Sequence, residues 1–331
     1  MSSQLLLQSV FKRYRGAAKD AVHDLSLVIK EGEILGVVGA SGSGKTTLIR
    51  MIAGLEKPSA GEISVGNRVV AGPKDFVRAE KRGVGLVFQE GALFPHMTVL
   101  NNVTYGLHGL PKSVRMGKAE EMLAMVGLPH KRLSYPHELS GGERQRIALA
   151  RALAPDPEVV LLDEPFSNLD PSLRAYLRNQ LLDIIRRVGA TAVVVTHDVL
   201  DALIIADRLA VFREGILVQC GPNDEVYHSP KDAYCARLFG PANPAPRAWL
   251  GQEILGGRTW LRPQELQLLC QPLQHAIEVQ VQGIQFQGDQ LGVRVEVTEG
   301  GRDEPLLIYA PISERELHPV GDKRWLTIKS T

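Results

Sequence analysis

Hydrophobic residues follow distinct spacings along the first 240 residues of this chain, and each spacing predicts a different kind of element. Short, mainly apolar runs at 32–39, 159–163 and 190–196 have the character of strands buried on both faces, which are typical of a parallel sheet. Between 171 and 189 the apolar residues recur at helical spacing, which predicts a helix packed on that sheet. The members of this stripe are Leu173, Leu177, Leu181, Ile184 and Ile185. The pattern predicts an α/β fold with a parallel-sheet core.

After residue 240 the hydrophobic period changes to two. The segment 240–251 contains three prolines, which disfavour regular structure and predict a linker. Beyond it, apolar and polar residues alternate at 277–282 and 293–298, as in half-buried antiparallel strands. With the apolar segments 306–311 and 325–330, these strands predict a small all-β barrel, oligonucleotide-binding-like in outline.

The expected domain organisation follows from these patterns. We expect an N-terminal domain over 1–240, with a helical subdomain at about 91–157 between its sheet-forming parts. The linker and the C-terminal barrel are expected over 241–331.

Residues 39–46, GASGSGKT, match the phosphate-loop pattern and lie between a predicted strand and a predicted helix. Glycines reach dihedrals closed to other residues, so successive backbone N–H groups can turn inward around a polyphosphate. Lys45 would neutralise phosphate charge, and the Thr46 hydroxyl would bind Mg²⁺. The predicted phosphate-binding residues are Gly39, Ser41, Gly42, Ser43, Gly44, Lys45, Thr46 and Thr47.

Two carboxylates follow the apolar run at 159–163. Asp163 ends the predicted strand, where a phosphate-loop protein usually places a magnesium ligand. Glu164 comes next and could polarise a water for attack on a γ-phosphate. We therefore expect Asp163 to be a metal ligand and Glu164 to be catalytic.

A second anion-binding helix N-terminus is expected at 139–143, LSGGE. Ser140, Gly141 and Gly142 precede a strongly helical stretch, so the backbone N–H groups of its first turn could face a phosphate. This segment has no lysine of its own. It is expected to complete a site on another copy of the chain, which predicts a homodimer.

Together these motifs resemble the ATPase subunits of ABC transporters over nearly all of positions 4–240. The resemblance implies that the nucleotide is ATP with Mg²⁺, that LSGGE is the family's signature motif, and that Tyr14 stacks on adenine. It implies that His197 is the switch histidine, which acts with Glu164 and Lys45 in catalysis.

The resemblance also assigns two loops. Gln89 is the lid-loop glutamine, which reaches the metal or the attacking water, and SNLD at 167–170 is the D-loop, with Asp170 near the nucleotide. The chain departs from the family at Glu143, where many members have Gln, and at Asn168, where Ala is frequent. These two departures bear on the rate of hydrolysis and not on its nature.

Composition and charge limit the possible partners and the cellular location of the protein. A net charge of +1 gives no electrostatic basis for binding nucleic acid, and three scattered cysteines without CxxC spacing indicate thiols in a reducing compartment. No apolar run approaches the roughly 18 residues of a transmembrane helix, and the N-terminus lacks the apolar content of a signal peptide. We expect a protein at the cytoplasmic face of the cell membrane, peripheral and held there by a partner.

The resemblance implies that this partner is a pair of membrane permease subunits, served by a periplasmic or extracellular substrate-binding protein. The segment 93–96 is expected to face the permease, the alternative being that it belongs to the core of the helical subdomain. Its residues are Leu93, Phe94, Pro95 and His96.

Three functions are compatible with these features. The leading hypothesis is an ATP-driven import motor; the others are a soluble ABC ATPase not coupled to transport and a regulator whose barrel senses a ligand. The segments 86–107 and 135–146 and the short barrel most resemble ferric-iron importers. Polyamine, sulfate, molybdate and sugar importers share most of these features and remain alternatives.

Overall fold

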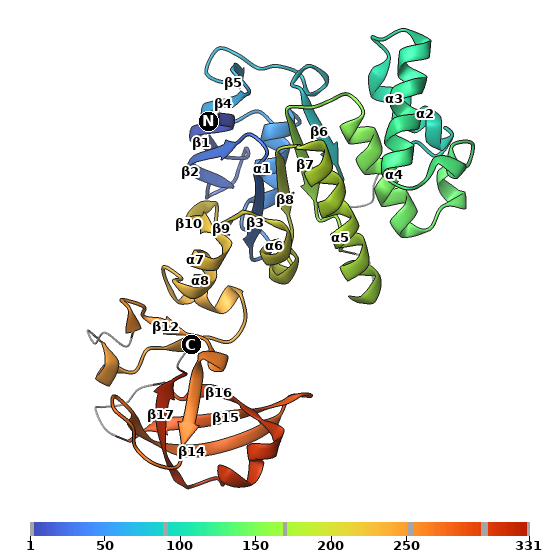
Figure 1. The fold of residues 1–331 in the computed structure, drawn as a ribbon. Helices are drawn as coiled ribbons and strands as arrows, with labels where there is room; N and C mark the ends of the chain where they lie inside the picture. The colour runs from blue at the N-terminus through green and yellow to red at the C-terminus, as the bar shows by residue number, and fades with distance from the viewer. Residues whose placement is uncertain (1–2, 89–91, 168–170, 251–254, 299–303, 330–331) are drawn as a thin grey trace. The chain divides into compact units, whose positions relative to one another are not determined.

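A computed structural model describes residues 3–88, 92–167, 171–250, 255–298 and 304–329 of the chain (Figure 1). The chain divides into two compact units, Met1–Asn223 and Asp224–Thr331. Each unit contains a hydrophobic core of its own residues.

The larger sheet of the first unit is built from the apolar runs of the sequence. Within the described residues its strand order is β10-β9-β3-β8-β7-β6, parallel except for the antiparallel β9–β10 pair. β3 and β8 are buried at every position, as expected for inner strands covered on both faces. The strands are β3 (Ile34–Gly39), β6 (Val84–Val87), β7 (Val159–Asp163), β8 (Ala192–Val195), β9 (Arg208–Arg213) and β10 (Ile216–Pro222).

A second, antiparallel sheet lies on the other side of helix α1 (Lys45–Ala53). Its strands are β2 (Val22–Lys30), β1 (Ser3–Lys12), β4 (Ala60–Val65) and β5 (Arg68–Ala71), in that order. Leu48, Ile49, Met51 and Ile52 of α1 are at most 1% exposed and share one core cluster with residues of both sheets. This packing fixes the helix that follows the phosphate loop.

Within the range expected for a helical subdomain, helices are grouped beyond the β6 edge of the large sheet (Figure 1). They are α2 (Val99–Thr104), α3 (Lys112–Met125) and α4 (Gly141–Leu153). Short 3-10 helices at Ala79–Lys81, Tyr105–Leu107, Pro129–Lys131 and Pro136–Glu138 connect the elements around them. Two further helices, α5 (Pro171–Val188) and α6 (Val199–Ile205), precede and follow β8. Of the helical stripe predicted at 173–185, Leu177, Leu181, Ile184 and Ile185 are buried on α5, whereas Leu173, near the start of the helix, is 38% exposed.

The second unit is mainly antiparallel β-structure. In the part of it that the structure describes, the main sheet has the order β13-β17-β14-β15-β16, and its end strands β13 and β16 approach each other. The sheet thus curves towards a barrel, which agrees with the predicted all-β architecture. Its strands are β13 (Leu266–Leu269), β14 (Ile277–Phe286), β15 (Gln290–Val297), β16 (Leu306–Pro311) and β17 (Lys323–Ile328). The remaining elements are α7 (Asn223–His228), α8 (Ala233–Leu238), β11 (Asn243–Pro244), β12 (Trp260–Leu261) and 3-10 helices at Arg247–Trp249, Pro263–Glu265 and Ile312–Leu317.

The division between the units falls before α7 and α8 rather than at residue 240, where the prolines suggested it. The buried Arg262 accounts for this difference. Its guanidinium donates to the carbonyl oxygens of Tyr227 (2.9 Å) and Ala236 (2.8 Å), and it lies 4.2 Å from the centre of the Tyr227 ring. One arginine from the C-terminal unit thus holds both helices in that unit.

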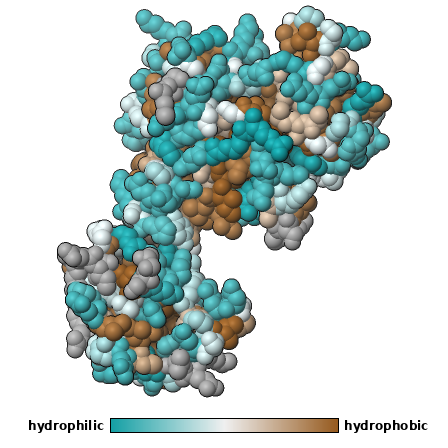
Figure 2. Space-filling model, viewed as in Figure 1, coloured by the Kyte–Doolittle hydropathy of each residue, from teal (hydrophilic) through white to brown (hydrophobic). Residues whose placement is uncertain are grey.

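The surface of the first unit carries exposed hydrophobic side chains at α6. Figure 2 shows hydrophobic side chains gathered over α6, where Leu200 and Ile204 are 57% and 41% exposed. Across the described residues, no helix combines the length and apolar character that crossing a bilayer requires.

Candidate nucleotide-binding site

The phosphate loop connects the buried strand β3 to α1. Gly44 immediately precedes α1 with φ 106°, and a Cβ at this position would collide with the Ala21 carbonyl oxygen, so only glycine fits here. Lys45 reaches back across the loop and donates to the carbonyl oxygens of Gly39 (2.7 Å) and Ala40 (3.0 Å). Burial lowers the pKa of Lys45, and the nearby Glu164 and Asp163 oppose this shift. The loop thus holds a buried cation at its centre.

The two carboxylates lie at the end of β7, as predicted. Burial and the neighbouring Glu164 raise the pKa of Asp163, while Arg50 and Lys45 lower it. Glu164 has a left-handed backbone, with φ 48°, and its N–H donates to the Val195 carbonyl oxygen at 2.8 Å. This turn follows directly from the parallel pairing of β7 with β8.

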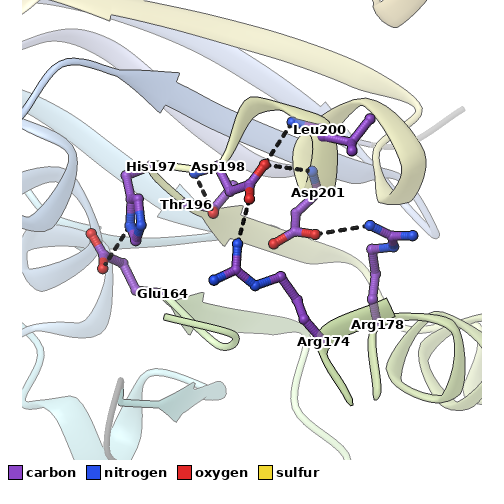
Figure 3. A network of polar contacts seen from close by, with 8 residues as sticks. All are labelled: Glu164, Arg174, Arg178, Thr196, His197, Asp198, Leu200 and Asp201. Atoms are coloured by element: carbon purple, nitrogen blue, oxygen red, sulfur yellow. Dashed lines mark hydrogen bonds and ion pairs between the residues drawn. The ribbon is translucent and has the colours of Figure 1, made fainter. Parts of the chain in front are cut away.

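The same pairing brings His197 to Glu164. β8 ends at Val195, which is opposite Asp163, so the residues that follow the two strands are neighbours. His197 Nδ1 lies 3.1 Å from Glu164 Oε2 (Figure 3). The two predicted catalytic residues, which are 33 positions apart in sequence, are therefore in hydrogen-bond contact.

A cavity of about 600 Å³ connects these groups to the helical subdomain. It is lined by Thr46, Arg50, Phe88, Ala92, Leu93, Pro136, Arg144, Asp163 and Glu164. The cavity thus places the predicted metal ligands Thr46 and Asp163 and the predicted base Glu164 around one space. Its two arginines were not predicted from the sequence, although Arg50 lies four residues after Thr46 and so on the same face of α1.

Tyr14 lies next to the start of α1. Its hydroxyl is 3.5 Å from the Thr47 hydroxyl, and Lys12 Nζ is 4.8 Å from the centre of its ring. Tyr14 is 37% exposed.

The signature segment forms a capped helix N-terminus. The Ser140 hydroxyl accepts from the Glu143 N–H (3.3 Å), and the Glu143 carboxylate accepts from the Ser140 N–H (2.8 Å). A Cβ on Gly142 would lie 2.8 Å from a methyl carbon of Leu177 in α5, so a larger residue would require that side chain to shift. Ser140, Gly141 and Gly142 do not line the cavity that holds Asp163 and Glu164. Two further predicted residues, Gln89 and Asp170, lie outside the described residues.

The fold and the site together define a phosphate-loop ATPase. The sequence model of the family described as ABC transporter matches residues 22–167. The Fe(3+) ions import ATP-binding protein of Pseudomonas fluorescens is 41% identical over 96% of this chain and 94% of its own length. The sulfate/thiosulfate import ATP-binding protein of Shewanella oneidensis is 38% identical over 92% of each chain.

Solved structures similar to this chain are also ATP-binding cassettes. A dimeric ATP-binding cassette in a post-hydrolysis state, bound to ADP and phosphate, superposes with a TM-score of 0.58 at 33% identity, covering 66% of this chain and 98% of that one. This chain belongs to the ABC transporter family. The family, the fold class and the ATPase activity predicted from the motifs are confirmed.

Proposed function

We propose that this chain is the ATPase subunit of an importer and that its cargo is ferric iron. The observation that carries the proposal is the similarity to the Pseudomonas fluorescens iron-import protein, which extends through the C-terminal unit as well as the ATPase. A similar protein from Haemophilus influenzae, 37% identical over 84% of this chain, is also named for Fe(3+) import. The sulfate importer is almost as similar, so sulfate is the competing cargo.

The site supports a division of roles among its residues. Lys45 and the loop N–H groups would bind the phosphates, and Tyr14 would stack on the adenine. Glu164 would accept a proton from the attacking water, and His197 would hold that carboxylate in place through Nδ1. His197 is therefore proposed to orient the base.

Thr46, Asp163 and the predicted Gln89 would hold Mg²⁺. Their oxygen atoms suit this hard cation, which keeps most of its coordination for water and phosphate oxygens. When bound, Mg²⁺ would neutralise charge that develops on the phosphates.

The signature segment supports a homodimer. Its capped helix N-terminus does not line the catalytic cavity of its own chain, so Ser140, Gly141 and Gly142 would complete the site of the partner subunit. Asp170 would contribute from the D-loop.

A second cavity, of about 700 Å³, supports docking to a permease. Phe94 lines it, and so do Tyr105, which packs on Phe94 with ring centres 4.4 Å apart, and Arg151, whose guanidinium lies 5.4 Å from the Phe94 ring. Asn102 fixes the backbone of Phe94 in this cavity lining, because its side chain forms hydrogen bonds with both the N–H and the carbonyl oxygen of Phe94. An apolar permease segment would fit there, with the ATPase at the cytoplasmic face of the cell membrane.

Uptake of radiolabelled Fe(3+) and of sulfate tests the proposal in cells that lack this chain. The wild-type chain should restore Fe(3+) uptake and leave sulfate uptake unchanged, and Glu164→Gln should restore neither. Tyr105→Ala should keep the ATPase activity of the purified subunit but lose uptake and co-purification with the permease. Restoration of sulfate uptake alone would assign the other cargo, and restoration of neither would contradict both of these cargoes.

A further inference from the structure

Two ion pairs join α5 to the N-terminal end of α6 (Figure 3). Arg174 Nη1 lies 2.5 Å from Asp198 Oδ2, and Arg178 Nη1 lies 3.0 Å from Asp201 Oδ1. The two arginines are one helical turn apart, so the pairs repeat the same cross-helix geometry. The first pair differs from the second in its place in the chain, because Asp198 directly follows His197.

Asp198 fixes the backbone beside His197. Its Oδ1 accepts from the N–H groups of Leu200 (3.0 Å) and Asp201 (3.4 Å), which caps α6. Its own N–H donates to the hydroxyl of the buried Thr196 at 3.0 Å. Because the residues on both sides of His197 are held, the imidazole has a defined starting point for its contact with Glu164.

The guanidinium of Arg174 adds the link to another element. Asp198 uses one carboxylate oxygen for the cap and presents the other to Arg174, which lies one turn inside α5. α5 begins at Pro171, immediately after the 167–170 segment predicted to contribute Asp170. A shift of α5 would therefore reach the residue next to His197 through the Arg174–Asp198 ion pair.

We propose that Arg174 is a positioning residue for hydrolysis: through Asp198 it holds His197 Nδ1 on the carboxylate of Glu164. This inference rests on the roles proposed above for Glu164 and His197. Arg174 does not line the catalytic cavity, so it acts through Asp198.

The different burial of the two ion pairs distinguishes a positioning role of Arg174 from a role in stability alone. The side chains of Arg174 and Asp198 are 24% and 29% exposed, whereas those of Arg178 and Asp201 are 12% and 2% exposed. The more exposed pair is better screened by solvent and should contribute less to stability, while breaking the more deeply buried pair leaves a charge without its counter-ion. Loss of Arg178 should thus harm folding more, and loss of Arg174 should harm turnover more.

The test compares Arg174→Gln with the matched control Arg178→Gln in the full-length chain. Arg174→Gln should lower kcat by about tenfold to a hundredfold, as expected for a misplaced catalytic group, with KM for ATP nearly unchanged and little loss of Tm. Arg178→Gln should lower Tm further and keep a wild-type kcat below its own transition. Arg174→Lys should recover part of the lost kcat.

Asp198→Asn provides a second variant that isolates the ion pair. Asparagine caps a helix as well as aspartate does, so α6 keeps its cap while the charge towards Arg174 is lost. Its kcat should fall as far as that of Arg174→Gln, and the double variant should be no worse than either single one.

The outcomes separate this inference from the proposed function. If Arg174→Gln keeps a wild-type kcat while His197→Ala is inactive, or if Arg178→Gln loses as much kcat as Arg174→Gln, the positioning role is overturned. If His197→Ala itself keeps wild-type turnover, the proposed role of His197 fails, whatever the arginine variants do.

Discussion

The structure gives Glu143 a role that the sequence motif alone does not show. At the sequence level it is a departure from the usual signature glutamine. In the structure its carboxylate accepts from the Ser140 N–H and lies 3.5 Å from Lys131 Nζ. Glutamine could accept the first of these bonds but could not form the ion pair. The residue therefore belongs to the cap of α4, which explains why either type can occupy this position.

This cap predicts a pH dependence of stability. The hydrogen bond from Ser140, helped by Lys131, lowers the pKa of Glu143. A carboxyl group with a lowered folded-state pKa stabilises the fold above its unfolded-state pKa of about 4.3, and this contribution is lost as the pH falls through the folded-state pKa. Glu143→Gln should therefore reduce the free energy of unfolding at pH 7, by up to about 1 kcal/mol, and by less at pH 4.

Urea unfolding of both proteins at the two pH values checks this expectation. Lys131→Met serves as the control, since it removes the ion pair and leaves the cap intact. An equal difference between wild type and Glu143→Gln at pH 7 and pH 4 would show that the charge is irrelevant to the cap.

At the scale of elements, the spacing of hydrophobic residues predicted the strands that are buried on both faces. The runs at 32–39 and 159–163 contain β3 and β7, because a short run of apolar residues is typical of a strand that has no solvent-exposed face. The contact of His197 with Glu164 could not be predicted in this way, since it depends on which strand lies beside β7 in the sheet. Strand order is set by long-range packing, which one sequence does not encode as a local pattern.

The position of α7 and α8 was missed for a related reason. The prolines after residue 240 disfavour regular structure, but they do not show on which core the preceding helices pack. The decisive residue, Arg262, lies 24 or more positions further along the chain than either helix. The carbonyl oxygens that it binds become visible only in the fold.

Arg262 should therefore determine the stability of the C-terminal unit. Arg262→Gln would leave the carbonyl oxygens of Tyr227 and Ala236 without their charged donor, at a cost of about 2–3 kcal/mol. Arg237→Gln is the matched control: this arginine belongs to the same unit and pairs with Glu304, but both side chains are more than half exposed, so its loss should cost less than about 1 kcal/mol.

Intrinsic fluorescence can measure this effect in the full chain. All three tryptophans, Trp249, Trp260 and Trp325, belong to the C-terminal unit, so their signal reports its unfolding separately from the ATPase. The fluorescence midpoint should fall for Arg262→Gln while basal ATP hydrolysis stays near wild type. A midpoint equal to that of Arg237→Gln would contradict the stabilising role of Arg262.

At the scale of the whole molecule, the proposed head-to-tail dimer can be tested by mixing two damaged chains. Lys45→Ala removes the cation of the phosphate loop, and Ser140→Asp places a negative charge where the partner's γ-phosphate would approach. Aspartate is chosen because it caps a helix as well as serine does, so α4 should remain folded. If sites form between subunits, each mixed dimer contains one doubly damaged site and one intact site.

The readout is ATP-dependent dimerisation with Glu164→Gln present in both chains, measured by size-exclusion chromatography with light scattering. That substitution removes the proposed base while keeping its size and hydrogen bonding, so ATP should bind and hold the dimer closed. The mixture should dimerise clearly better than either variant alone, because its one intact site contributes binding free energy that the homodimers lack. If each site instead lies within one chain, no intact site can arise by mixing, and the mixture should dimerise no better than its two components.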